Sequence, residues 1–254
     1  MLALNIMNTR QKTFLKNLRK GEELFIAEEA RRFGVSEMTI RRDFQFLEDE
    51  GLAIRTHGGA VIKDNANNEL HNLSRTNEAQ KKIAKEALKF IKPSSTIMIS
   101  TGTTPLEVAR EIAKSGMNLS VVTNSLPVAA ALFKTDVEVL LTGGALRKQS
   151  MDLVGPVTEK NLGEFYIDLL IIGCNGADSE EGFFTSDINL AVMEKKSVQI
   201  SADVMIVTES YKFQKRSFAK FASLKEVSTV ITDKDISKKQ AMEMKKKGIK
   251  VIIS

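Results

Sequence analysis

Apolar residues recur at helical spacing through the first 50 residues of the chain, and this pattern predicts three short helices. In one of them, Ile26, Ala30 and Phe33 stand at i, i+4 and i+7 and form a single apolar stripe. Gly34 then supplies a turn, and Ser36 is a favourable N-cap for a further helix. Two short amphipathic helices joined by so tight a turn predict a helix-turn-helix.

The helix that follows Ser36 separates apolar residues from basic ones. It begins at Glu37 or close to it, and its core-facing stripe is Ile40, Phe44 and Leu47. The opposite face and its flanks are polar and basic, and they carry Met38, Thr39, Arg41, Arg42 and Gln45. A recognition helix inserts such a face into the major groove, where arginine bonds guanine edges or phosphates. We therefore expect Ser36 and this face to contact double-stranded DNA.

A wing is predicted directly after this helix. The stretch LAIRTHGGAVI contains two short β-prone runs around a glycine turn, which is typical of a hairpin. Within it we expect Arg55 and His57 to reach phosphates or the minor groove. The alternative for His57 is a hydrogen-bonded turn residue without a ligand.

After residue 77 the pattern changes to apolar runs that alternate with helical segments. The first helix carries an apolar stripe from Ile83 to Ile91 and is stopped by Pro93. Seven runs then look like buried strands, at residues 96–99, 119–123, 137–142, 168–173, 204–208, 228–232 and 250–254. This alternation predicts an α/β domain with a mainly parallel sheet that is covered on both faces.

The two patterns are separated by residues 64–77, which are polar and rich in asparagine and resemble a linker. We therefore expect a DNA-binding domain over residues 1–63, a linker over 64–77, and an effector-binding domain over 78–254.

Small polar residues follow the predicted strands, at the sheet edge where α/β proteins bind ligands. After the first strand, residues 100–104 combine hydroxyls with a glycine before the helix at Pro105, a loop that can hold a phosphate. Asparagine and serine bond sugar hydroxyls, and arginine and lysine pair with phosphate. The residues that we expect to contact such a ligand are Gly102, Thr103, Thr104, Asn124, Ser125, Gly143, Gly144, Arg147, Asn175, Glu209 and Lys212.

Composition adds limits to this picture. The chain has 254 residues, of which 43% are hydrophobic and 27% charged, which is ordinary for a globular protein, and its net charge of +5 suits a polyanion. One cysteine and two histidines far apart in sequence predict no disulfide, no metal site and no cofactor. No run of 18 apolar residues occurs, so we expect a cytoplasmic protein without a membrane partner.

Two longer motifs resemble a known family. VSEMTIRRDFQFLEDEG followed by R-T-HGGA, over residues 34–60, closely resembles the helix and wing of the DeoR family. The series GTT, TNS, GG-x-L-R, NG and E-S-Y-K-F, over residues 78–235, resembles the DeoR C-terminal sensor domain. That domain has a fold similar to ribose-5-phosphate isomerase and CoA-transferase-like proteins. Many members have aspartate where Ser100 and Glu209 stand in this sequence.

The resemblance implies specific roles for several residues. The principal DNA-facing residues would be Ser36, Thr39, Arg41 and Arg42, with His57 and Gly58 in the wing. It further implies a sugar phosphate as inducer, with ligand contacts at Gly102, Thr103, Thr104, Asn124, Ser125, Gly143, Gly144, Arg147 and Lys212. We expect a homodimer or homotetramer that places recognition helices in successive major grooves, represses a sugar-metabolism operon and is released from operator DNA by a phosphorylated sugar. Activation instead of repression is the alternative.

The alternative is a sugar-phosphate isomerase-like enzyme with a DNA-binding arm. In that case Glu194 would stand where a general base is needed, and Glu209 and Lys212 would complete a proton-transfer site. However, the lysine in a glycine-rich loop that is typical of such isomerases has no counterpart in EEGFFTSDINL. We therefore expect a regulator and not an enzyme.

Overall fold

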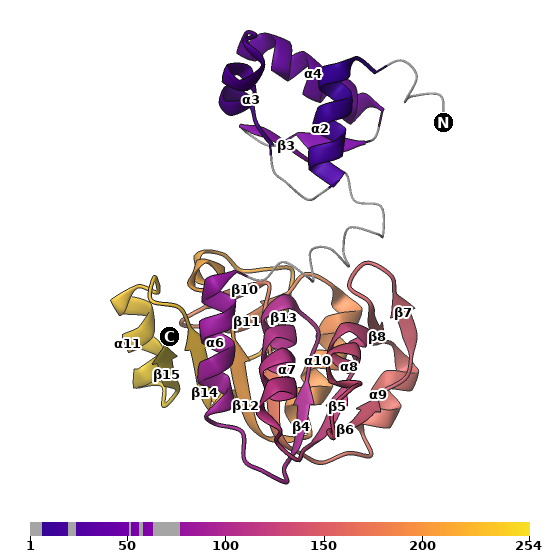
Figure 1. The fold of residues 1–254 in the computed structure, drawn as a ribbon. Coiled ribbons are helices and arrows are strands. Elements are labelled where there is room, and N and C mark those ends of the chain that lie inside the picture. The colour runs from indigo at the N-terminus through magenta and orange to yellow at the C-terminus, as the bar shows by residue number, and fades with distance from the viewer. Residues whose placement is uncertain (1–6, 20–23, 51, 56–57, 63–76) are drawn as a thin grey trace. The chain divides into compact units, whose positions relative to one another are not determined.

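The computed structural model describes residues 7–19, 24–50, 52–55, 58–62 and 77–254. The chain divides into two compact units, Met1–Arg75 and Thr76–Ser254 (Figure 1). Most of the expected linker, residues 64–76, lies outside the described residues. No helix in the described part of the chain is long and apolar enough to cross a membrane.

The first unit packs helices against a small antiparallel sheet. The helices are α2 (Thr9–Arg19), α3 (Ile26–Phe33) and α4 (Glu37–Asp49), and the strands β1 (Leu24–Phe25), β2 (Ala53–Arg55) and β3 (Gly59–Ile62) lie in the order β1-β3-β2. Gly34 ends α3 with a φ of 63°, a left-handed conformation that glycine adopts without strain. The predicted helix-turn-helix and hairpin wing are both confirmed.

Aromatic rings hold this unit together. The ring of Phe14 in α2 packs edge-on against Phe33 at 5.3 Å and against Phe44 at 5.2 Å between centroids. Phe14 and Phe44 are fully buried. Because aromatic pairs of this geometry add stability beyond their buried area, Phe14 stabilises the packing of α2 against both α3 and α4.

The second unit is built on a seven-stranded parallel sheet with the order β15-β14-β12-β9-β4-β5-β6. Its strands are β4 (Thr96–Ile99), β5 (Ser120–Thr123), β6 (Glu138–Leu141), β9 (Ile167–Ile172), β12 (Ser201–Val207), β14 (Thr229–Thr232) and β15 (Lys250–Ile253). Each of the seven predicted runs overlaps one of these strands, and β9 and β12 begin one and three residues before their runs. The prediction of a mainly parallel α/β sheet is therefore confirmed.

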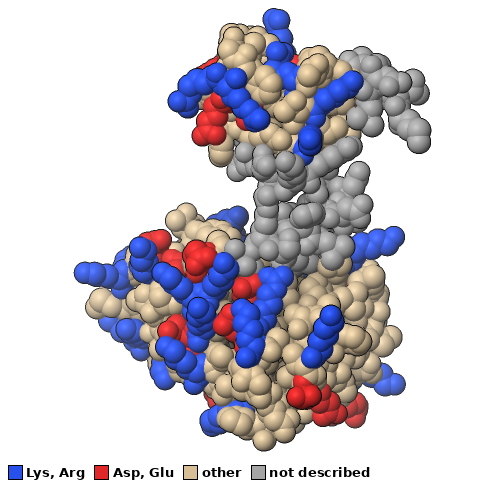
Figure 2. Space-filling model, viewed as in Figure 1, with Lys and Arg blue, Asp and Glu red and all other residues tan. Residues whose placement is uncertain are grey.

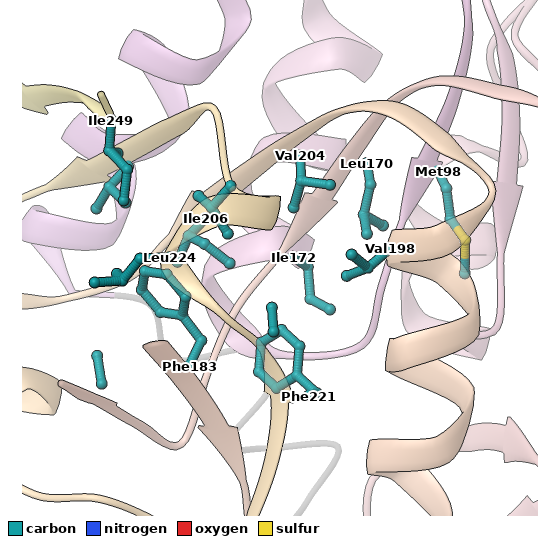
Figure 3. Packing of buried hydrophobic residues seen from close by; sticks show 14 of the residues in the cluster. Met98, Leu170, Ile172, Phe183, Val198, Val204, Ile206, Phe221, Leu224 and Ile249 are labelled. Carbon is teal, nitrogen blue, oxygen red and sulfur yellow. The ribbon is translucent and has the colours of Figure 1, made fainter. Parts of the chain in front are cut away.

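Helices cover both faces of this sheet. On one face α6 (Glu78–Leu88) and α7 (Thr103–Ser115) lie side by side, followed by α8 (Leu126–Leu132) (Figure 1). The core of the other face includes residues of α10 (Ile188–Gln199) and α11 (Lys238–Lys246). Alternate residues of the central strands point into this second core (Figure 3), among them Leu170, Ile172, Val204 and Ile206.

Short antiparallel elements, which the sequence did not predict, complete the unit. The strands β10 (Gly176–Asp178), β11 (Gly182–Thr185) and β13 (Ala219–Ala222) form one small sheet. The strands β7 (Ala145–Arg147) and β8 (Asp152–Val154) form a hairpin that leads into α9 (Pro156–Leu162). Two short 3-10 helices, η1 (Ser210–Gln214) and η2 (Leu224–Glu226), follow β12 and β13.

One expectation about the sheet was wrong. The run that forms β6 was expected to be a buried strand, but Leu140 and Leu141 are each 43% exposed. The reason is position, because β6 is the last strand of the sheet order and pairs only with β5.

Candidate DNA-binding surface and effector site

The N-terminus of α4 is built as the sequence predicts. The side chain of Ser36 accepts a hydrogen bond from the backbone N–H of Thr39 at 3.3 Å, and the helix begins at Glu37. Side-chain oxygens at this position satisfy amides that the first helical turn leaves unpaired. The start of the recognition helix is therefore fixed by its own sequence.

A buried carboxylate sets which face of α4 points outward. Asp43 is only 4% exposed and accepts hydrogen bonds from Gln11 Nε2 at 2.9 Å and Asn8 Nδ2 at 3.3 Å, and it pairs with Arg10. Its partners lie in and just before α2, so the network ties α4 to that helix beside the apolar stripe. Burial of Asp43 was not predicted, because a single acidic residue in an amphipathic helix is typical of its solvent-facing side.

The residues expected to contact DNA lie on the exposed side of α4, away from the apolar stripe. Arg41 and Arg42 are exposed, and Met38 is 60% exposed. Arg41 makes only a loose pair with Glu37, at 3.8 Å, and such exposed pairs hold a side chain weakly. Gln45 instead donates to Asp49 Oδ1 at 2.8 Å, so its amide faces the acidic end of the helix. Figure 2 shows several Lys and Arg side chains on the visible face of this unit.

The wing residues are described only in part. Arg55 ends β2 and pairs in register with Ala60, but its side chain lies outside what the structure describes, as does His57 altogether. Gly58 is exposed, and its carbonyl accepts a hydrogen bond from the N–H of Ile26 at 2.9 Å. The wing is thus hydrogen-bonded to the start of α3.

In the second unit, the loop after β4 leads into α7 earlier than expected. The helix begins at Thr103 and not at Pro105, with Gly102 as the N-cap at a φ of 128°. Thr103 and Thr104 therefore lie in the first turn, where backbone N–H groups lack partners within the helix. The positive end of the helix dipole also favours an anion here.

Glu209, from the loop after β12, lies against this turn. Its carboxylate accepts hydrogen bonds from Thr104 Oγ1 at 3.2 Å, Gln80 Nε2 at 3.1 Å and Asn77 Nδ2 at 3.1 Å. The N–H of Lys212 donates to the carbonyl of Glu209 at 3.1 Å, which brings the lysine to the same edge of the sheet. The expected residues Thr104 and Glu209 thus contact each other, Thr103 joins them through Gln80, and Lys212 follows in the same turn as Glu209.

Arg147 belongs to a second group of charges. Its guanidinium donates to both carboxylate oxygens of Asp152, at 2.8 and 2.6 Å, and lies 3.4 Å from Asp187. Asp152 is fully buried. A phosphate bound by Arg147 would have to share the guanidinium with these carboxylates, and the sequence suggested neither aspartate.

Glu194 on α10 lies close enough to Arg147 and Asp152 for their charges to affect its pKa. Burial raises the pKa of its carboxyl well above the ordinary value, an effect that the charge of Arg147 opposes and that of Asp152 reinforces. Burial also raises the pKa of the Cys174 thiol to about 12, and the charges of Lys212, Glu194 and Glu209 all act on that thiol. Cys174 therefore lies within electrostatic range of both groups.

Four buried polar side-chain atoms lack hydrogen-bond partners among the described residues, namely Ser100 Oγ, Asn124 Oδ1, Glu194 Oε2 and, at the end of β14, Thr232 Oγ1. Ser100 and Asn124 follow β4 and β5, which are neighbouring strands in register. Leaving such a group unpaired costs about 1–3 kcal/mol, so it marks a place where a polar ligand or water gains a hydrogen bond. Asn124 was predicted as a ligand contact and Ser100 as part of the phosphate-holding loop, whereas Glu194 was predicted a role only in the enzyme alternative.

Local structure accounts for several other expected contacts. Gly144, at a φ of 126°, passes so close to α9 that a Cβ there would lie 2.0 Å from Thr158 Oγ1, and the carbonyl of Gly143 accepts from that hydroxyl at 2.6 Å. Ser125 is the N-cap of α8. Asn175 Oδ1 accepts from Thr185 Oγ1 at 3.1 Å. These residues shape the strand ends whether or not they touch a ligand.

A winged helix-turn-helix joined to an α/β domain with a polar cluster at its strand ends defines a DNA-binding regulator with a sensor domain. Residues 10–66 match the DeoR-like helix-turn-helix domain, and residues 75–234 match the DeoR C terminal sensor domain. The chain belongs to the DeoR family of transcriptional regulators.

Curated proteins with similar sequences are transcriptional regulators. The chain is 31% identical over 250 residues to a putative aga operon transcriptional repressor of Escherichia coli O157:H7, covering 96% of this chain and 93% of that protein. It is 38% identical to the regulator GlpR of Haloferax volcanii, over 86% of this chain and 87% of that one. It is 33% identical to the glycerol-3-phosphate regulon repressor of Escherichia coli K12, over 79% and 81%. The prediction of a regulator is confirmed, and the enzyme alternative gains no support.

Among solved structures, the chain is similar to ribose 5-phosphate isomerase A of Methanocaldococcus jannaschii. The identity is 16%, the alignment covers 56% of this chain and 54% of that one, and the TM-score is 0.40.

Proposed function

We propose that this protein represses an operon for sugar metabolism in the cytoplasm and leaves its operator when a phosphorylated sugar binds at the strand ends of the second unit. The observation that carries the proposal is the pairing of an anion-compatible helix start with buried polar groups that lack partners. The amides of Thr103 and Thr104 suit a phosphate, and the free atoms of Ser100 and Asn124 suit hydroxyls. One ligand that carries both chemistries is a sugar phosphate.

The names of relatives support this ligand class. They include a glycerol-3-phosphate regulon repressor and a lactose phosphotransferase system repressor. On the DNA side, the exposed Arg41 and Arg42 on α4 support major-groove binding. We further propose a homodimer or homotetramer, because paired recognition helices double the contacts with a repeated operator.

The test begins with the full-length chain and a pool of random duplex DNA. Selection of bound sequences should yield one repeated motif, and affinity for it should fall steeply as salt rises. The bound complex is then challenged with glycerol 3-phosphate, ribose 5-phosphate, fructose 6-phosphate, galactose 6-phosphate and inorganic phosphate. At least one sugar phosphate should raise the melting temperature and release the DNA, with a coupling free energy of about 1–3 kcal/mol.

Two outcomes would contradict the proposal. If selection enriches no DNA sequence, the protein does not recognise an operator. If inorganic phosphate and every sugar phosphate have equal effects, the site does not recognise the sugar. Turnover of any of these sugar phosphates by the free protein would instead favour an enzyme.

A further inference from the structure

The first turn of α6 has side chains that do more than cap the helix. Asn77 is the N-cap, and its side-chain oxygen accepts from the N–H of Gln80 at 2.9 Å. In return Gln80 Oε1 accepts from the N–H of Asn77 at 3.1 Å. This reciprocal capping box uses only the oxygen of each amide.

The amide nitrogens of the same two residues reach into the strand-end cluster. Asn77 Nδ2 donates to Glu209 Oε1 at 3.1 Å, and Gln80 Nε2 donates both to Glu209 Oε1 at 3.1 Å and to Thr103 Oγ1 at 3.0 Å. Gln80 is only 6% exposed, and Glu209 lies 129 positions further along the sequence. The two residues thus join the start of α6 to the site.

Helix capping alone does not require amides at these positions. Serine at the N-cap with glutamate at the third helical position makes the same box. The chain uses that pair at η2, where Ser223 and Glu226 cap each other. A carboxylate at position 80 could not donate to Glu209, whereas an amide both caps the helix and donates. The choice of Asn77 and Gln80 is therefore explained by the site and not by the helix.

The position of this pair in the chain gives it a further consequence. Asn77 is the first described residue after residues 63–76, the stretch of chain that connects the two units. A phosphate bound at the Thr103 turn would place negative charge beside the Glu209 carboxylate. Gln80 donates hydrogen bonds to both Thr103 and Glu209. Any shift of Glu209 or Thr103 on binding therefore changes the bonds that hold the first turn of α6.

We propose that Asn77 and Gln80 are positioning residues of the effector site and that they transmit its occupancy to the segment leading to the DNA-binding unit. This inference rests on the proposed function of the strand-end cluster. It assigns the pair a role in the coupling between the two sites and none in operator contact itself.

The test separates capping from coupling. In Asn77→Ser the hydroxyl still caps α6, but the donor to Glu209 is lost. In Gln80→Glu the capping oxygen remains, while a carboxylate replaces the donor beside Glu209. The matched control is Glu78→Ala, because Glu78 lies between the two residues, is exposed and pairs only with Lys81 among the contacts described for it. The control weakens the first turn of α6 without touching the site.

The quantity measured is the ratio of operator dissociation constants with and without the sugar phosphate that most stabilises the full-length wild-type chain. We expect Asn77→Ser and Gln80→Glu to lower this ratio at least about fivefold. Operator affinity without the sugar phosphate should stay within about twofold of wild type, and Glu78→Ala should keep the wild-type ratio.

Each other outcome has one meaning. A lower melting temperature with an unchanged ratio in both variants would show a capping role only and overturn the inference. So would failure of both variants to fold, or an equal loss of coupling in Glu78→Ala. If the wild-type chain responds to no sugar phosphate, the proposed function has failed; if it responds and the variants respond equally, only this inference has failed.

Discussion

Gly59 at the start of β3 lies so close to the carbonyl of Leu24 in β1 that a Cβ on Gly59 would stand 2.0 Å from that oxygen. The neighbouring Gly58 has no atom within 4 Å of the corresponding position. Packing of the sheet therefore requires glycine at position 59 and not at position 58.

Gly59→Ala should destabilise the first unit. The added methyl group meets backbone and not a flexible side chain, so β3 must move away from β1, at a cost of about 2 kcal/mol or more. Thermal denaturation of the full-length chain should show an earlier transition for this unit, with weaker operator binding. Gly58→Ala is the control and should leave that transition in place. An unchanged transition in Gly59→Ala would mean that the wing relaxes without loss.

Arg42→Ala and Arg41→Ala should each weaken operator binding without unfolding the chain. Both side chains are exposed, Arg42 on the face of α4 opposite Phe44 and Arg41 at the flank of that face, and an arginine that bonds a guanine edge contributes about 1–3 kcal/mol. Fluorescence anisotropy on operator and on unrelated DNA measures the change. The control Lys12→Ala removes one exposed charge from α2 and should affect both DNAs alike. Operator binding of wild-type strength in both arginine variants would exclude α4 as the recognition helix.

The sequence predicts those parts of the molecule that depend on local pattern. The stripe Ile40, Phe44 and Leu47 and the cap at Ser36 define α4 within one segment, and each parallel strand contains consecutive apolar residues. The short strand Gly176–Asp178 was missed because three residues with a glycine and an aspartate have no strand-like periodicity.

Contacts between distant segments explain the rest of what sequence reasoning missed. The loops of the candidate site follow the strands and could be predicted, because parallel strands end at one edge. Gln80 could not, since its bond to Glu209 spans 129 positions. Asp152 was missed for a different reason, because it is only five positions from Arg147 but meets it across a hairpin that was not predicted. A residue type alone does not show that its side chain is buried or paired.

Glu194→Gln should change how stability depends on pH. Because burial raises the pKa of Glu194 in the folded protein above the ordinary 4.5, the folded state holds a proton that the unfolded state has released. The resulting stabilisation is complete below pH 4.5 and is lost as pH rises through the folded-state pKa. Glutamine mimics the protonated form at every pH, so its stability relative to wild type should increase with pH.

Urea denaturation of both proteins at several pH values from about 5 to about 8 measures this difference, and using the difference cancels the titration of all other groups. Parallel pH curves for the two proteins would show that Glu194 titrates alike in the folded and unfolded chains.

Lys212→Met should reduce the response to sugar phosphate while leaving operator binding intact. The Lys212 ammonium lies 4.8 Å from the centre of the Tyr211 ring, and its backbone is tied to Glu209 beside the Thr103 turn. Methionine keeps the apolar stem but lacks the charge, and a hydrogen bond to a charged group contributes about 1.5–3 kcal/mol. Binding of the sugar phosphate should therefore weaken about tenfold to about a hundredfold, as measured by the shift in melting temperature. Lys215→Met removes an exposed charge just past η1 and serves as the control. If Lys212→Met releases DNA at the same sugar phosphate concentration as wild type, the ammonium does not bind the phosphate, and the anion is held by the helix start alone.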